Sequence, residues 1–329
     1  MKFFPYAQNF ITGIFDFKIS FRQKTFFESY PGPFFRSVFG KVLKESLCDK
    51  KETACINCHK RDVCIYSILH DAPHNKKINI EFDMSETNFP KPFFMTPITD
   101  YPYEYKDKDR IMTVEVVLIG NALKYLKEVV SYFSEAGNHG VDKKRFEFDL
   151  ISVSDSLIGK EIFKNGKFLT EKMTAYSVIP EENEMELTSI GIHLFTPLVL
   201  TSRHMLIDDI HFSDIWTTLV RRIILLTEVY GGKMINLENV KKSIDISKGV
   251  KKEQERIHLI KLSRYSATQQ KIIPLSGYTG KFVFSGVPKG FLPILKMCEI
   301  IHIGKGLTSG LGKYKLNIKN NRIIIAGRK

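Results

Sequence analysis

Residues 304–313 combine the residue types that bind anions: four glycines, two lysines, a threonine and a serine. Glycine has no Cβ, so such a segment lets backbone N–H groups approach a ligand closely, and the lysines add positive charge. The segment therefore predicts an anion-binding loop. Its glycines are Gly304, Gly306, Gly310 and Gly312, and its lysines are Lys305 and Lys313.

A nucleotide-binding P-loop is excluded. That motif needs a glycine five residues before its Gly-Lys pair and a serine or threonine after the lysine, whereas Leu307 and Tyr314 hold these positions. The order of elements is also reversed, because an apolar helical stretch precedes this loop and a strand-like stretch follows it. The expected ligand is therefore not a free nucleotide triphosphate.

The positive charge of the chain is concentrated in the same part of the sequence. Residues 1–202 carry 26 Lys+Arg against 27 Asp+Glu, whereas residues 203–329 carry 23 against 9. Such a field attracts polyanions, of which nucleic acid is the commonest. An anionic membrane is the less favoured alternative, because the basic residues do not follow one amphipathic helix. A generally basic, soluble surface with no specific polyanion is the other alternative.

Four of the five cysteines lie close together and predict a structural zinc site. In a cytoplasmic protein, clustered thiols hold metal more often than they form disulfides, and four thiolates suit tetrahedral zinc. Free thiols are the alternative, since only one C-x2-C pair is present, and His59 could replace one ligand. The fifth cysteine, Cys298, lies in an apolar run and is expected in the core. The predicted ligands are Cys48, Cys55, Cys58 and Cys64.

The elements that position these residues are predicted to form two similar domains. In the first half, alternation predicts strands at 14–21, 78–82, 111–119 and 145–153, helices ending near Leu47 and over 121–136, and a loop at 89–109. In the second half, strands are expected at 187–194, 257–262, 281–285 and 313–318, with helices over 214–230 (Ser213 as N-cap) and 291–301. Each order is β-α-β-β-α-β, which predicts an α+β protein of two tandem ferredoxin-like domains, residues 1–180 and 181–329, with the cysteine segment inserted in the first.

No stretch approaches the ~18 consecutive apolar residues of a membrane span, and polar residues interrupt the start before a signal sequence forms. We therefore expect a cytoplasmic protein.

These features together resemble one family, the CRISPR-associated endoribonucleases of the RAMP superfamily that trim repeat transcripts into guide RNAs. The resemblance covers nearly the whole chain and is most specific in the second half. It rests on the glycine loop at 302–314, on Arg264-Tyr265-Ser266-x-x-Gln269 leading to Gly277-x-x-Gly280, and on the Arg221-Arg222 helix. Gly32-x3-Arg36-x3-Gly40, followed by four cysteines, is similar to a zinc-bearing branch.

The resemblance implies CRISPR repeat RNA as substrate and partner, with other CRISPR effector subunits as further partners. It also implies cleavage without a catalytic metal, in which an activated 2′-hydroxyl gives a 2′,3′-cyclic phosphate and a 5′-hydroxyl.

Several residues could bind RNA without reference to the family. Arg264 offers a guanidinium for phosphate and Tyr265 a ring for base stacking, although a structural Arg/Tyr pair on an edge strand is an alternative. The loop can donate N–H groups to phosphates, whereas a simple helix-to-strand connection would need only one or two glycines. Weaker candidates, for which an ordinary surface or ion-paired role is the alternative, are Arg36, Arg203, Arg221 and Arg222.

Cleavage through the 2′-hydroxyl needs a general base and a cation for the developing phosphorane charge. Histidine is the usual base, because its unperturbed pKa of ~6.5 lies close to working pH. His302 ranks first because it adjoins the glycine loop, although a helix-capping role is as plausible. Lys305 is the expected cation, and Tyr30 a candidate proton carrier. The lower-ranked histidines are His59, His70 and His204.

Two rival functions are open at this point. A RAMP protein can also be a non-catalytic subunit that holds guide RNA in an effector complex, and no clear catalytic constellation excludes this. A zinc-containing DNA-binding protein is disfavoured, because no helix-turn-helix spacing is present.

Overall fold

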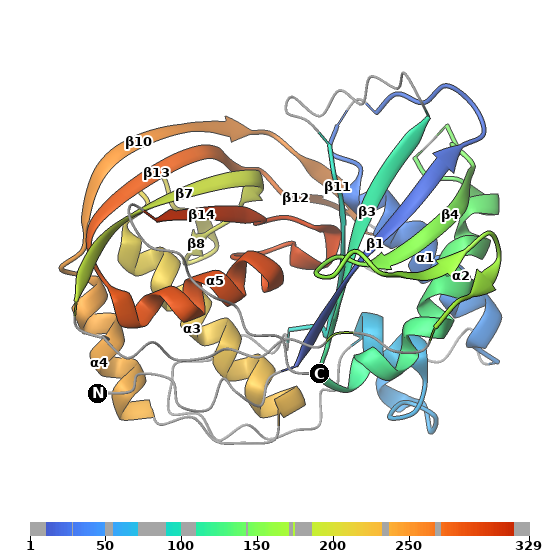
Figure 1. Ribbon diagram of the computed structural model, residues 1–329, viewed down its shortest axis with the longest axis horizontal. Coiled ribbons are helices and arrows are strands. Elements are labelled where there is room, and N and C mark those ends of the chain that lie inside the picture. The colour runs from blue at the N-terminus through green and yellow to red at the C-terminus, as the bar shows by residue number, and fades with distance from the viewer. Residues whose placement is uncertain are drawn as a thin grey trace. The chain divides into compact units, whose positions relative to one another are not determined.

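The computed structural model describes residues 11–27, 29–49, 55–71, 90–99, 110–142, 144–170, 174, 186–231, 237–266 and 271–318. The chain divides into two compact units (Figure 1). The N-terminal unit comprises Ile11–Tyr176 with Glu228–Gly232, and the C-terminal unit comprises Ser177–Thr227 and Lys233–Arg328 with Met1–Phe10. None of the described helices is long and apolar enough to cross a membrane.

The N-terminal unit has a ferredoxin-like sheet in which every neighbouring pair of strands is antiparallel. The strand order is β2-β3-β1-β4, extended by a hairpin at the β4 edge. Its strands are β1 (Thr12–Phe21), β2 (Phe93–Pro97), β3 (Ile111–Ile119), β4 (Phe148–Asp155), β5 (Glu161–Lys164) and β6 (Lys167–Phe168); its helices are α1 (Gly32–Leu47) and α2 (Leu126–His139). Single turns lie at η2 (Cys55–Asn57), η3 (Ser67–Asp71) and η4 (Gly120–Tyr125).

Aromatic side chains from β1 and both helices fill the core of this unit. Phe17 of β1 meets Phe133 of α2 edge-on at 5.1 Å between ring centroids, and Phe35 of α1 stacks on Phe133 at 6.3 Å. Gly137 allows α2 to approach β4 closely, because a Cβ there would lie 2.1 Å from the carbonyl oxygen of Phe148. The helices therefore cover one face of the sheet, as the alternating sequence predicted.

One strand of this unit lies where the sequence predicted a loop. Residues 93–97 form β2, which pairs with β3 from Phe93 opposite Leu118 to Pro97 opposite Val114. The sequence suggested a loop there because of its prolines, but all five residues of β2 are buried, and burial decides the strand. The strand predicted at 78–82 lies outside the described residues.

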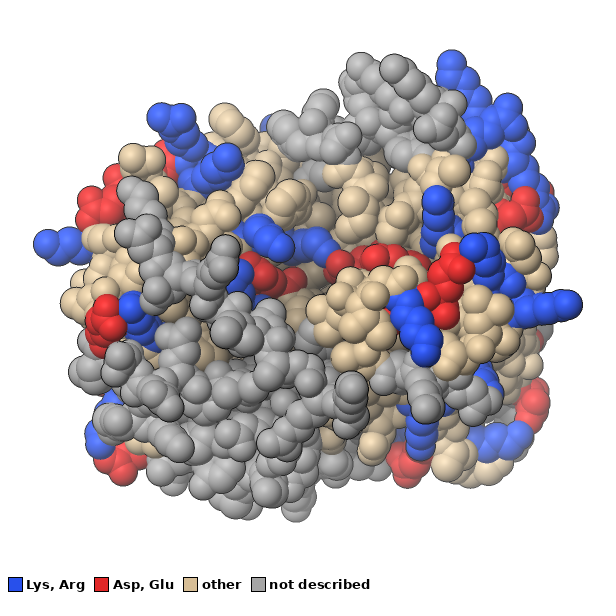
Figure 2. Space-filling model, viewed as in Figure 1, with Lys and Arg blue, Asp and Glu red and all other residues tan. Residues whose placement is uncertain are grey.

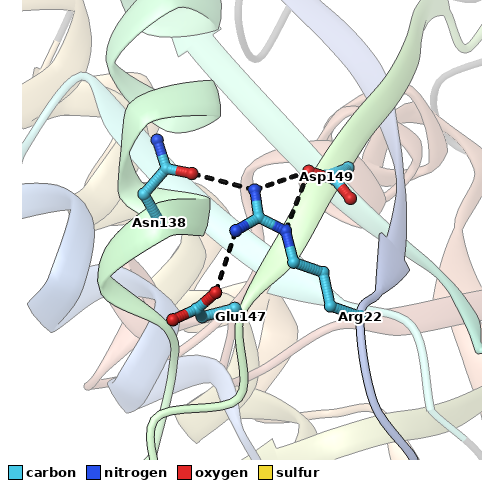
Figure 3. Close-up of polar contacts among 4 residues, drawn as sticks. All are labelled: Arg22, Asn138, Glu147 and Asp149. Carbon is cyan, nitrogen blue, oxygen red and sulfur yellow. Dashed lines mark hydrogen bonds and ion pairs between the residues drawn. The ribbon is translucent and has the colours of Figure 1, made fainter.

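An exposed arginine joins three elements at one edge of the N-terminal unit. Arg22, just after β1, contacts Asp149 of β4 at 2.7 Å, Glu147 at 2.8 Å and Asn138 of α2 at 2.8 Å (Figure 3). Hydrogen bonds to Asp149 and Glu147 raise the pKa of the Arg22 guanidinium. The cluster ties the end of β1 to the start of β4.

The C-terminal unit repeats the arrangement with the strand order β10-β13-β7-β14, again entirely antiparallel. Its main strands are β7 (Leu187–Leu198), β10 (Lys251–Ile260), β13 (Gly277–Pro288) and β14 (Tyr314–Ile318). Two hairpins are added, β8 (Thr201–Ser202) with β9 (Met205–Leu206) and β11 (Ser263–Ser266) with β12 (Lys271–Pro274). The helices are α3 (Phe212–Leu226), α4 (Leu237–Ser247) and α5 (Leu292–Ile301), with turns η6 (Lys289–Phe291) and η7 (Leu307–Ser309). The turn η5 (Thr227–Gly231) follows α3 and, from Glu228 on, belongs to the N-terminal unit.

The core of this unit forms between the sheet and the helices on one of its faces. Trp216 of α3 stacks on Phe291 at 3.7 Å, and its indole nitrogen donates to the Ser243 hydroxyl of α4 at 3.1 Å. Tyr314, at the position where a P-loop would have a hydroxyl residue, is buried with its own hydroxyl bonded to Leu295 of α5. Cys298 is fully buried, as predicted.

The α+β class and the tandem ferredoxin-like plan are confirmed, with two local corrections in the second half. The N-cap of α3 is His211 rather than Ser213, since His211 and Asp214 form a capping box. Helix α4 and the two small hairpins were not predicted.

Candidate nucleic-acid interface

The backbone of the glycine loop needs glycine at four positions. Gly304, Gly306, Gly310 and Gly312 have φ of +94°, +73°, +78° and +73°, a region that other residues rarely adopt. A Cβ on Gly312 would lie 1.8 Å from the carbonyl oxygen of Ile303. The glycines therefore fix the shape of the loop and are not merely tolerated.

Part of the loop backbone is bound to the end of β7. The Lys305 amide donates to the Val199 carbonyl at 2.9 Å, and the Gly312 amide to that of Pro197 at 3.0 Å. The Thr196 hydroxyl donates to Gly310 O and accepts from the Lys313 amide, both at 2.8 Å. The expectation that the whole loop offers bare amides was therefore too broad. The anchoring role of Thr196 has no signal in the sequence, because its partners lie more than a hundred residues away.

The other part of the loop keeps amides available for a ligand. The N–H groups of Gly304, Gly306 and Thr308 have no hydrogen-bond acceptor in the described part of the chain, and these three residues are half-buried. Lys305 lies between the first two and is exposed. Oriented amides of this kind beside a lysine form an anion-binding concavity.

A hairpin lies next to this loop. Strand β8 begins two residues after Val199, whose carbonyl oxygen accepts the hydrogen bond from the Lys305 amide. Arg203 and His204 form the tip of the β8–β9 hairpin, and both have positive φ. Arg203 is four residues from Val199, a chain distance of at most ~14 Å. Both tip residues are exposed. The fold thus brings Arg203 and His204 to the same end of the sheet as Lys305.

A second hairpin starts at the same end of the sheet. Leu275, which follows β12, bonds through its amide to Leu262 O at 2.8 Å, and a Cβ on Gly306 would lie 3.5 Å from the Leu275 side chain. Arg264 pairs with Ile273 in this hairpin, and Tyr265 with Ile272. The base of the β11–β12 hairpin therefore lies beside the glycine loop.

Comparison of the sequence with known protein families identifies the part of the chain that contains the glycine loop and the two hairpins. Residues 192–314, which include the loop and both hairpins, match the family described as CRISPR-associated endoribonuclease Cas6. The C-terminal part of the chain therefore carries a Cas6-family domain. Residues 10–177 match, and belong to, the family described as AF_1859_N, N-terminal domain. No curated protein matches the sequence.

Solved structures share the fold of this chain at low sequence identity. Thermus thermophilus Cas6 aligns with a TM-score of 0.54 and 11% identity, over 94% of this chain and 99% of that one. A Cas6 product complex aligns at 0.56 and 11%, over 92% and 98%. A partial Cas6-RT-Cas1–Cas2 complex aligns at 0.55 and 14%, over 99% and 49%. The likeness covers both ferredoxin-like units.

Three other arginines were predicted to bind RNA, two on α3 of the C-terminal unit and one on α1 of the N-terminal unit. Arg222 is half-buried, and its Nε donates to the Ile301 carbonyl at 2.9 Å, so it holds the end of α5 where the loop begins. Arg221 is exposed on α3. Arg36 is half-buried on α1 of the N-terminal unit, where its charge acts on His70. Arg222 therefore positions the start of the loop, and its contact with RNA stays a prediction.

The histidine ranked first is inside the protein. His302 has no exposed surface, ends α5 at φ +59°, and its Nδ1 lies 3.2 Å from the carbonyl oxygen of Leu311. A ring enclosed in this way fixes the start of the loop and does not meet a substrate hydroxyl. Tyr30 is also buried, at 1% exposure. Proximity in sequence favoured His302, but burial argues against it as the base.

His70 is likewise enclosed by aromatic side chains. Its ring stacks on Tyr66 at 5.4 Å and lies 5.8 Å from Phe39 and from Phe93. Burial lowers the pKa of His70 well below its usual value, and the charges of Arg36 and Lys91 lower it further. His70 is therefore held neutral in the folded state.

This burial predicts a pH-dependent stability. Below about pH 6.5 the unfolded chain protonates His70 whereas the folded chain resists, so the free energy of unfolding falls as pH drops from 7.5 to 5.5. A His70→Leu variant should lose less stability over that range than the wild-type chain, measured by urea denaturation at both pH values. His59→Leu, at an exposed site, should leave the difference unchanged. An equal pH dependence in His70→Leu would show that other groups cause it.

The four clustered cysteines line one small cavity in the N-terminal unit. The cavity has a volume of about 50 Å³, and Cys48, Cys55, Cys58 and Cys64 are all half-buried around it. Among the described residues, no group of three or more His, Cys, Asp or Glu side chains has an arrangement ready to hold a metal. The four-thiol donor set suits zinc chemically, so zinc stays a prediction.

Proposed function

We propose that this chain is an endoribonuclease that cuts CRISPR repeat transcripts into guide RNAs by attack of the 2′-hydroxyl. The reaction needs no metal and leaves a 2′,3′-cyclic phosphate and a 5′-hydroxyl. One observation carries the proposal: the available amides of the glycine loop, Lys305 and the Arg203-His204 tip lie at one end of the sheet in a Cas6-family fold. Phosphate binding and proton transfer can therefore act on the same nucleotide.

The roles follow from the chemistry of each group. The amides of Gly304, Gly306 and Thr308 and the ammonium of Lys305 bind the scissile phosphate and stabilise its developing negative charge. His204 accepts the 2′-hydroxyl proton, so that this oxygen attacks phosphorus. The bond to the 5′-oxygen breaks, and solvent water at this exposed site gives the departing oxygen the proton of the 5′-hydroxyl. Of the four candidate histidines, His204 and His59 are exposed, and His204 is the one at this end of the sheet.

The solved relatives suggest the partners. One related Cas6 structure is a product complex, and another contains Cas6 with RT, Cas1 and Cas2. We infer that repeat RNA binds this chain as substrate and that other CRISPR proteins assemble with it.

The test is incubation with a hairpin repeat RNA in EDTA, followed by mass spectrometry of the products. Cleavage with a 2′,3′-cyclic end is the expected result. Tight binding with the RNA left intact would instead identify a subunit that holds guide RNA. Loss of cleavage in EDTA, restored by added magnesium, would overturn the metal-free mechanism.

Removing the loop lysines should weaken RNA binding and its salt dependence. Each lysine that neutralises a phosphate contributes about 0.7–0.9 to the slope of log K against log salt, so Lys305→Ala/Lys313→Ala should lower the slope by about 1–2. Lys241→Ala/Lys248→Ala removes two exposed lysines of the α4 region and controls for net charge. Fluorescence anisotropy between 50 and 300 mM salt measures both, and an unchanged slope in the loop variant would place the RNA elsewhere.

The cysteines lead to a separate prediction about metal. Purified protein should contain about one zinc per chain, and Cys55→Ser/Cys58→Ser should lose it together with several degrees of melting temperature. Elemental analysis and thermal unfolding measure the two effects. Cleavage per folded molecule should persist, because the site is proposed to be structural. A folded variant that has lost cleavage outright would show that the metal does more than stabilise.

A further inference from the structure

The cysteine segment of the N-terminal unit encloses a charged side chain. Arg61 lies between Cys58 and Cys64 in the sequence and is only 6% exposed. Its Nε and Nη2 atoms are inside the protein and have no hydrogen-bond partner in the part of the chain that the structure describes. The basic side chains visible in Figure 2 reach solvent, whereas these two nitrogen atoms do not. A buried charge needs a compensating anion, and arginine cannot release its proton to avoid that need.

The described acidic residues of this segment do not supply the anion. Asp49 forms its ion pair with the ammonium of Lys60, and both of these side chains are exposed. Asp62, which follows Arg61, is also exposed. Neither carboxylate bonds to the buried nitrogen atoms of Arg61. The remaining groups that can carry negative charge beside the guanidinium are the cysteine thiols.

Tight turns bring Arg61 to the same side of the segment as the cysteines. The Cys58 amide donates to the Cys55 carbonyl at 3.1 Å, and the Arg61 amide donates to the Cys58 carbonyl at 3.1 Å. Residues three apart in such turns lie one above another, so these three side chains share one side. Cys64 is the next residue at the same spacing.

Arg61 also lines the cavity of about 50 Å³ that the four cysteines surround. Cys48 enters it from the end of α1, where its amide donates to the Lys44 carbonyl at 3.0 Å. The described thiols do not already surround one point, so a metal ion has to draw them together. Metal binding and ordering of the segment are therefore coupled.

The charge of the guanidinium discriminates between the states open to the thiols. Free thiols and disulfides are neutral and leave the buried charge without a counterpart. Zinc binds cysteine as thiolate and releases the thiol protons to solvent, so an ion with four thiolates carries a net double negative charge. Groups that hydrogen-bond the ligands of a metal orient them and tune its affinity. The unpartnered N–H groups of Arg61 match such a centre in sign and in position.

We propose that Arg61 is the counter-charge of a zinc–tetrathiolate centre. Its Nε–H and Nη2–H groups donate to thiolate sulfur atoms and offset part of the negative charge. Zinc was predicted from the four ligands alone, and Arg61 is the residue that stabilises the loaded centre. The inference rests on zinc binding and not on RNA cleavage, so a chain that fails to cleave RNA leaves it intact.

The first test measures the zinc affinity of the full chain by competition with a chromophoric chelator. Arg61→Leu should bind zinc about 10- to 100-fold more weakly, as expected when a group that hydrogen-bonds a metal ligand is removed. Arg61→Lys keeps the charge but loses the planar fork, so its affinity should lie between the two. Lys60→Leu removes the neighbouring exposed cation and should bind nearly as the wild-type chain does, because exposed charges are screened. Equal weakening by Arg61→Leu and Lys60→Leu would overturn the contact, since net charge would explain both.

Thermal unfolding gives a second readout, which an arginine bonded to the protein itself would not give. Without metal, Arg61→Leu should melt at a higher temperature than the wild-type chain, because an apolar side chain replaces an unpaired buried charge. Excess zinc should raise the melting temperature of the wild-type chain more than that of the variant, which binds zinc more weakly. A metal-free variant that is less stable than the metal-free wild-type chain would contradict the proposal, because Arg61 would then have a partner in the protein.

Cobalt(II) in place of zinc reports on the sulfur atoms directly. Its thiolate-to-metal charge-transfer band should move to lower energy in Arg61→Leu, because a sulfur that accepts fewer hydrogen bonds donates more strongly to the metal. The band should stay in place in Lys60→Leu. An unshifted band in Arg61→Leu, iron with inorganic sulfide in place of zinc, or a wild-type chain that binds no zinc would each overturn the assignment.

Discussion

His204→Ala will bind repeat RNA as the wild-type chain does and cleave it about 100- to 10,000-fold more slowly, the usual effect of removing a general base. His204 is exposed at the tip of the β8–β9 hairpin, which begins two residues after the carbonyl that holds Lys305. The side chain makes no contact that maintains the core, so its removal should leave folding intact. Single-turnover cleavage with saturating protein measures the chemical step apart from binding.

Two matched variants make this result decisive. His59→Ala changes the other exposed candidate, in the cysteine segment, and should cleave at the wild-type rate. Arg203→Ala changes the neighbouring tip residue and should weaken binding more than it slows the bound complex. If His204→Ala cleaves normally while His59→Ala does not, the base lies in the N-terminal unit and the proposed constellation is wrong.

Gly312→Ala is expected to disrupt the loop and destabilise the C-terminal unit by about 3 kcal/mol or more. The positive φ of this residue costs about 1–2 kcal/mol for alanine, and forcing a methyl group into packed atoms costs about 1–3 kcal/mol further. The obstacle is backbone, since the Cβ would lie 1.8 Å from the Ile303 carbonyl oxygen, and Ile303 itself donates to Gly312 O at 3.0 Å. RNA binding should fall with stability, because the amides and Lys305 lose their positions.

Gly286→Ala provides the matched control in the same unit. Gly286 also has positive φ, +75°, but no atom lies within 4 Å of its added Cβ. This variant should lose only the conformational part, about 1 kcal/mol, and bind RNA normally. Urea denaturation and anisotropy of both variants measure the difference. Equal losses in the two would show that φ alone, and not the packing at Ile303, fixes the loop.

The sequence predicted those parts of the fold that depend on local patterns. Alternation of apolar residues located β1, β3, β4 and β7, and apolar periodicity located α3 and α5, because one face of each element is buried. It failed at β2, where prolines suggested a loop while neighbouring strands enclosed the segment. It also missed α4 and the small hairpins, whose apolar patterns are short.

The sequence predicted which residue types form the site, but it did not predict which individual residue has which role. The glycine loop and the basic C-terminal half could be recognised from the sequence alone, because clusters of glycine and lysine are unusual without an anionic ligand. Whether a given histidine reaches solvent was not visible. His302 adjoins the loop in sequence but lies in the core, whereas His204, a hundred residues away, is exposed near the same loop.

By itself, the sequence determined that this chain has two similar α+β halves, a glycine loop for an anion and a positive charge suited to nucleic acid. These properties depend on residue type and on spacing within short segments, which the chain carries before it folds. Only the tertiary structure decided which loop amides are already bonded to β7 and which histidines are enclosed. Those outcomes depend on packing between residues far apart in sequence, which is not encoded in any local pattern.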